Sequence, residues 1–395
     1  MERHLHGNFG RGWATLIEMR ASVWGALAWV LVGCASPPVA VAPAHLAVAT
    51  QIVTAGQDTT EPELFKRAQR ELLDGDYLAA KRDFELLLKS DPHVEILPAV
   101  LFDLGTVYEA LGERESAQGA YHVLATKFPA LPTSRTALVR CVWIHAALEE
   151  WKPLGETGDA LLARTDLDPL DRMTALGARG LSRAENGDTD LAMRDVQNGI
   201  DMMEDLHIGR TSKLPPAGAQ LKFALAETRR VTTERIALQP VGEDFVTKVS
   251  MRCQGLLDAQ AAYADAMRTT DPQWAMMAGY RLGAMYQKLH RELMSIPPDG
   301  FAKNEHQRQI FYGIMHVRYR ALLDKALIML NTTLEVADKV GDKSSWVDRG
   351  REQKAQMEST LTEEKATIAK FPFTEEEIEK AIQIMREKAA KDAHH

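Results

Sequence analysis

The pattern of apolar and polar positions changes near Glu61. From there on, apolar residues recur at helical spacing in a sequence rich in Ala, Leu, Glu, Arg and Lys, while Pro and Gly lie at the boundaries. No stretch alternates apolar and polar residues as a half-buried strand would. The chain from residue 61 is therefore predicted to be all-α.

A short phrase recurs within this helical pattern. Its turns fall at Gly75, Gly112, Glu149 and Gly187, so successive copies are 37, 37 and 38 residues apart, and the last two copies are degenerate. An ordinary helical bundle has no reason to keep a fixed period. The period therefore favours stacked, repeated helix pairs.

Each copy also places residues where two packed helices need them. Small residues on both helices allow close approach: Ala68, Gly105 and Gly180 on the first helix, and Ala80, Ala117 and Ala192 on the second. Phe84 and Tyr121 are expected to fill the space between neighbours. Pro92 and Pro129 are expected to stop the second helix.

These residues resemble the tetratricopeptide repeat (TPR), which has a period of about 34 residues. The resemblance implies a TPR-like α-solenoid over residues 61–205 and a degenerate TPR-like region over 206–372. In this family the first helix of each pair lines a concave groove that binds a partner protein. The implied groove residues are Phe65, Gln69, Phe102, Thr106, Val139, Trp143 and Tyr280. The alternative is that neighbouring helices, or the chain's own N-terminal segment, cover these side chains.

Longer helices are predicted in the C-terminal half. Breaks at Pro215-Pro216 and at residues 239–242 delimit a helix through Glu234 and another over 244–270. A further helix follows Pro272, and an insertion over 297–300 separates it from one running from about Glu305 to Val340. Residues 373–395 are predicted to form a charged C-terminal helix.

A second resemblance covers about Leu256 to Arg351. The matching residues are Asp271-Pro272-Gln273-Trp274-Ala275, Gly279-Tyr280-Arg281-Leu282-Gly283, Leu322-Leu323-Asp324-Lys325-Ala326 and Trp346. This stretch resembles repeat-bearing lipoproteins of gliding bacteria, including components of their motility machinery. The resemblance implies a role in an envelope complex.

The N-terminal region carries a 13-residue apolar run, Ala21 to Gly33, which ends at Leu31-Val32-Gly33-Cys34. The run is shorter than the ~20 residues of a membrane-spanning helix, and a small residue precedes the cysteine. This box resembles the lipobox of bacterial lipoproteins. It implies a signal peptide over 1–33, with Met19 as a possible true start, then a lipidated Cys34 and a flexible tether over 34–60.

Lipidation of Cys34 would anchor the chain to a membrane without spanning it. Ala35-Ser36 follows the cysteine where an acidic residue would signal retention in the inner membrane, so the resemblance implies the periplasmic face of the outer membrane. The alternative is that the apolar run is a buried N-terminal helix and its cysteine a core residue.

Charge and cysteine content narrow the possible partners. The net charge is −8, and removal of residues 1–33 takes away three arginines and two glutamates, which leaves about −9. No basic patch favours nucleic acid. Cys141 and Cys253 fall in separate predicted repeats, so both are expected to be buried free thiols.

No chemical motif is apparent. Metal-ligand spacings, phosphate-binding loops and nucleophile elbows are missing, so neither metal nor cofactor is predicted. His290, His306 and His316 are expected at the surface or as caps, and Glu149-Glu150 in a solvated turn. We therefore expect a non-enzymatic scaffold that binds other envelope proteins. The alternatives are an assembly factor or pilotin-like lipoprotein and, more distantly, a hydrolase with a site near the insertion between Ser295 and Glu305.

Overall fold

The computed structural model describes residues 60–210, 214–269, 271–300, 302, 304–380 and 382–383. The predictions about the signal peptide, Met19, Cys34 and the tether up to residue 59 lie outside these residues, as does the end of the chain from residue 384. The structure divides into two compact units whose described parts are residues 60–141 and 142–383. They are described separately below.

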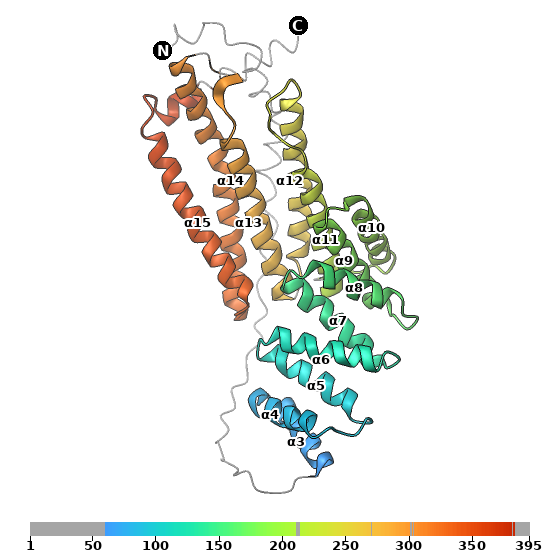
Figure 1. Ribbon diagram of the computed structural model, residues 1–395. Coiled ribbons are helices and arrows are strands. Elements are labelled where there is room, and N and C mark those ends of the chain that lie inside the picture. The colour runs from blue at the N-terminus through green and yellow to red at the C-terminus, as the bar shows by residue number, and fades with distance from the viewer. Residues whose placement is uncertain are drawn as a thin grey trace. The chain divides into compact units, whose positions relative to one another are not determined.

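The unit of residues 60–141 consists of antiparallel helix pairs joined by short turns. Its helices are α3 (Glu61–Asp74), α4 (Tyr77–Lys89), α5 (Leu97–Ala110), α6 (Arg114–Lys127) and the first part of α7 (Pro132–Ala147) (Figure 1). Each helix packs against the next from α3 to α6, and α3 also contacts α5. This arrangement is the predicted stack of helix pairs.

The predicted turns adopt one backbone conformation. Gly75, Gly112 and Gly187 have φ angles of 79°, 78° and 88°, and Glu149 at the third turn has φ 58°. All four are therefore left-handed, as is common just after a helix. The spacing of 37, 37 and 38 residues is confirmed as a structural period, even where glycine is missing.

The predicted packing residues lie between the helices. Ala68, Ala80, Phe84, Ala117, Tyr121 and Ala192 are fully buried. A Cβ atom on Gly105 would lie within 2.8 Å of three Tyr121 ring atoms, so only glycine allows this ring to reach α5. The second helices end at Lys89 and Lys127, shortly before the two predicted stop prolines.

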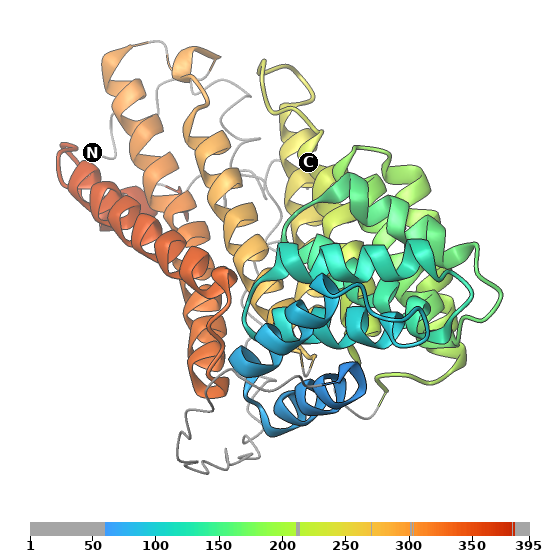
Figure 2. The same cartoon turned by 60° about the horizontal axis from the view of Figure 1, so that its bottom comes forward.

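The unit of residues 142–383 begins with three shorter helices and continues with long ones. They are α8 (Trp151–Leu162), α9 (Pro169–Glu185), α10 (Thr189–Asp205), α11 (Pro216–Glu234), α12 (Phe245–Ala266), α13 (Pro272–Met294), the 3-10 turn η1 (Pro298–Gly300), α14 (Glu305–Val340) and α15 (Ser345–Ile368). Helices α13, α14 and α15 pack against one another side by side (Figures 1 and 2).

The helix boundaries confirm most of the sequence-based expectations in this unit. The bounds of α11 and α14 coincide with the predicted limits; Pro216 marks the start of α11 and Gly341 the end of α14. Fully buried Trp274 and Trp346 form part of its core. Across the described residues, the one β-bridge, between Leu214 and Thr269, leaves the class all-α as predicted.

Candidate protein-binding site

Four of the predicted groove residues lie on the first helices of two successive pairs. Phe65 and Gln69 are on α3, Phe102 and Thr106 are on α5, and all four are half-buried. The Gln69 amide Nε2 donates a hydrogen bond of 3.0 Å to the Asp103 carboxylate, which joins the two helices side to side. We call these four residues and Asp103 the α3–α5 face.

The aromatic rings of this face lean onto the second helix of their own pair. The centroid of Phe65 lies 6.3 Å from that of Phe84, and Phe102 lies 5.8 Å from Tyr121. Each ring is therefore anchored on one side while part of it stays accessible. Val139 on α7 is only 7% exposed, so its side chain offers almost no surface to a partner.

Asp103 is the acidic group of the α3–α5 face. Burial raises the pKa of its carboxyl group, and the hydrogen bond from Gln69 opposes that shift only in part. Among the described residues, no lysine, arginine or histidine forms an ion pair with it. The face thus combines two aromatic rings with a partly desolvated, uncompensated carboxylate.

The other two groove residues belong to the unit of residues 142–383. The Trp143 carbonyl accepts a 3.3 Å hydrogen bond from Gln273. Tyr280 lies 5.4 Å from Trp346, and the Arg349 guanidinium stacks over both rings at 4.6 Å and 4.0 Å. Neighbouring side chains of α15 therefore cover Tyr280 in part, as in the alternative raised by the sequence.

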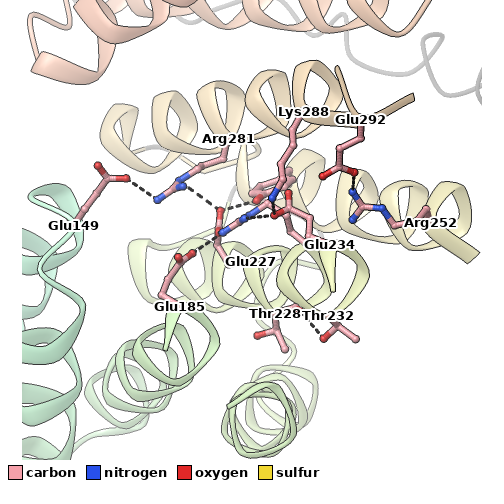
Figure 3. Close-up of polar contacts among 12 residues, drawn as sticks. Glu149, Glu185, Glu227, Thr228, Thr232, Glu234, Arg252, Arg281, Lys288 and Glu292 are labelled. Atoms are coloured by element: carbon pink, nitrogen blue, oxygen red, sulfur yellow. Dashed lines mark hydrogen bonds and ion pairs between the residues drawn. The ribbon is translucent and has the colours of Figure 1, made fainter. Parts of the chain in front are cut away.

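A network of alternating acidic and basic side chains runs through the same unit (Figure 3). The turn residue Glu149 accepts from Arg349 at 2.9 Å and from Arg281 at 2.6 Å. The Arg281 Nε atom lies 3.7 Å from the fully buried Glu227. The expectation of a solvated turn at Glu149 is wrong, because its side chain is only 28% exposed.

The buried end of this charge network is centred on Arg230 of α11. Its Nη2 atom donates to Glu227 at 2.5 Å and to Glu185 at 2.7 Å, and its Nη1 atom donates to Glu234 at 3.0 Å. The hydroxyl of Tyr263 donates to Glu227 at 2.5 Å. The charge network therefore links α9, α11, α12 and α13.

Two of the three carboxylates that pair with Arg230 have pKa values shifted in opposite directions. Burial and the adjacent Glu227 raise the pKa of Glu185 to about 8. Burial alone would also raise the pKa of Glu227, but Arg281 and Arg230 outweigh it and hold that pKa well below its usual range. The surroundings therefore favour the ionised form of Glu227 and disfavour that of Glu185, as expected for two close carboxylates.

His306 is exposed, as expected, but His290 and His316 depart from the expectation of surface or capping positions. His290 is only 3% exposed on α13, and its Nε2 atom lies 3.4 Å from Glu364 of α15. His316 of α14 also hydrogen-bonds to Glu364. Sequence spacing could not reveal this cluster, because its members come from three helices.

The described residues also include two cysteines and an apolar cavity. Cys141 and Cys253 are buried and free, as predicted, and burial raises their pKa values to about 12 and 11. Within the same residues no His, Cys, Asp and Glu group could hold a metal ion, and no helix is long and apolar enough to span a bilayer. An apolar cavity of about 70 Å³ lies between α13 and α14, below the ~300 Å³ of ordinary ligand sites.

The chain was compared with protein families, curated proteins and solved structures. No protein-family model matches the chain, and no curated protein matches it. Among solved structures, it is similar to a tetratricopeptide repeat protein from Parabacteroides merdae ATCC 43184, with 14% sequence identity and a TM-score of 0.39. The match covers 75% of this chain and 98% of that chain. The stack of helix pairs is established by the helices described above rather than by this similarity.

Proposed function

We propose that the chain is a lipid-anchored, TPR-like scaffold that binds other proteins of the bacterial envelope. In this proposal Cys34 carries the lipid, and the helical units face the periplasm from the outer membrane. The envelope complex is a motility or secretion apparatus. The role is binding rather than catalysis.

The observation that carries the proposal is the α3–α5 face. Stacked helix pairs present equivalent positions of successive first helices side by side, and here those positions hold Phe65, Gln69, Phe102 and Thr106. Aromatic residues contribute disproportionately to protein interfaces. Attachment to a membrane raises the effective concentration of partners confined to the same surface, so a modest affinity suffices.

The anchor is supported by the sequence Leu31-Val32-Gly33-Cys34. Intact-mass measurement of the protein purified from its own membranes tests it. The expected product begins at Cys34 and carries three acyl chains, and Cys34→Ala should release the protein from the membrane. An unacylated, freely soluble wild-type protein would contradict the anchor.

Partner binding is tested separately by replacing Phe102 with Ala in the anchored protein. Cross-linking in intact cells should lose the specific partner bands, while far-UV circular dichroism keeps its helical signal. Leu86→Ala is a matched control, because Leu86 lies on the second helix of a pair and is 50% exposed. An unchanged cross-linking pattern for Phe102→Ala would show that this face binds no partner.

A further inference from the structure

The α3–α5 face contains a charge that the chain does not neutralise. Asp103 lies between Phe102 and Leu104 on α5, and within the described part of the chain its side chain accepts its hydrogen bond from the neutral amide of Gln69. Transfer of a carboxylate out of water is costly unless a cation compensates it. The raised pKa of Asp103 reflects this uncompensated burial.

Two more deeply buried aspartates of this chain have cationic partners, and the partly buried Asp271 accepts from the backbone N–H groups of Gln273 and Trp274 at the start of α13. Asp83 in the same unit accepts from Arg67 at 2.5 Å, and Asp195 accepts from Arg179 and Arg183 at 2.7 Å and 2.5 Å. Asp103 differs from both because it is half-buried, whereas Asp83 and Asp195 are only 1% and 3% exposed. The missing cation therefore has room to come from another molecule.

We propose that the α3–α5 face binds a partner segment that places a lysine or arginine against Asp103, flanked by apolar side chains against Phe65 and Phe102. This inference rests on the proposed function and adds the chemistry of the partner. Gln69 holds the carboxylate in position, and the two rings supply apolar contact on either side. A cation between aromatic rings and a carboxylate is stabilised by cation–π attraction and by a charge-assisted hydrogen bond.

The segment directly before α3 does not fit this description. Residues 34–60 contain no lysine or arginine, so the proposed tether cannot supply the cation. The chain's own C-terminus is a rival occupant, because residues 384–395 contain Arg386, Lys388 and Lys391. The experiment therefore has to separate a partner protein from this segment.

Selection from a phage library of random 12-residue peptides on the purified chain tests the proposal. We expect the enriched peptides to carry Lys or Arg with apolar neighbours. Asp103→Asn keeps an acceptor for Gln69 and removes the charge, so it should abolish the enrichment of basic residues. The matched control Asp74→Asn changes an exposed carboxylate at the end of α3 and should leave that enrichment unchanged.

A selected peptide, synthesised with a fluorescent label, measures how much Asp103 contributes to the affinity. Its dissociation constant should rise at least tenfold with Asp103→Asn and stay within twofold with Asp74→Asn. For the wild-type chain, affinity should fall as the pH is lowered toward the raised pKa of Asp103, because protonation removes the charge. The Asp103→Asn variant should not show this pH dependence.

The outcomes separate this inference from the proposed function. If the enriched peptides lack basic residues, or if Asp103→Asn enriches the same peptides, no cation pairs with Asp103. The α3–α5 face would then still bind proteins. No enrichment on either the full chain or a chain lacking residues 384–395 would overturn both the inference and the binding role of this face. Enrichment that requires deletion of residues 384–395 would show that the chain's own C-terminus is the occupant.

Discussion

Glu149 occupies a turn position where the other three repeats have glycine, and this difference gives a sharp prediction. Its φ of 58° places a side chain in the left-handed region, which costs ~1 kcal/mol relative to glycine. In return, its carboxylate pairs with Arg281 and Arg349. These pairs are partly exposed, so each contributes ~0.5 kcal/mol.

The comparison of Glu149→Ala with Glu149→Gly separates the two effects. Both variants lose both ion pairs, but only glycine relieves the turn. Glu149→Ala should therefore destabilise its unit by ~1 kcal/mol. Glu149→Gly should be more stable than Glu149→Ala by ~1 kcal/mol.

Urea unfolding followed by tryptophan fluorescence measures this difference in the right unit. After residue 33, every tryptophan lies in the unit of residues 142–383: Trp143, Trp151, Trp274 and Trp346. With a urea dependence of ~2.5 kcal/mol per molar, the two midpoints should differ by ~0.4 M. Equal midpoints, or a less stable glycine variant, would show that the left-handed backbone at this turn does not favour glycine.

Glu156 is the matched control, because it is exposed inside α8 and pairs only with Lys152. Within a helix, glycine is less stable than alanine by ~1 kcal/mol. Glu156→Gly should therefore be less stable than Glu156→Ala. The order of the two variants is thus opposite at Glu149 and Glu156.

Three further predictions follow from buried groups. Burial lowers the pKa of His290 below its value in the unfolded chain, so the unfolded chain takes up the extra proton. The free energy of unfolding should therefore fall as the pH drops through ~6.5. His290→Gln should flatten this pH dependence in urea titrations at several pH values. Gly105→Ala should cost ~1–3 kcal/mol because its Cβ would meet Tyr121, whereas Gly119→Ala, with open space around it, should stabilise by ~0.5–1 kcal/mol; amide hydrogen exchange in α5 and α6 reports both. Glu227→Gln should cost ~3 kcal/mol by tryptophan fluorescence, because Arg230 and Arg281 lose the fully buried carboxylate that they share and keep the more exposed Glu185, Glu234 and Glu149; a change below 1 kcal/mol would contradict the network's role.

The helix pairs could be predicted because local signals define them. Gly75 and Gly112 mark left-handed turns, and the small residue Gly105 marks the point where Tyr121 approaches α5. Such signals need only a few neighbouring residues. For the same reason, the long helix α14 was predicted with its correct ends.

The polar clusters could not be predicted because their members are far apart in the sequence. Arg349 reaches a carboxylate 200 positions away at Glu149, and His290 and His316 meet at Glu364 of a third helix. One sequence signal was available in retrospect. A glutamate at a turn position otherwise held by glycine indicates that its side chain has a specific partner.

The α3–α5 face was predicted only in part. Phe65, Gln69, Phe102 and Thr106 followed from the repeat register, whereas Asp103 lies outside the two positions that the register assigns to the groove. Its position became apparent only from the hydrogen bond between α3 and α5. Register therefore gives the helices that form a surface but not every side chain on it.

The proposed role of the α3–α5 face is to bind another protein in the cell envelope. The most direct measurement places a photo-reactive amino acid at Phe102, and separately at the exposed control position Leu86, in the anchored protein and irradiates intact cells. We predict specific protein cross-links from position 102 that are missing from position 86. Equal cross-linking from both positions, or none from position 102, would contradict this role.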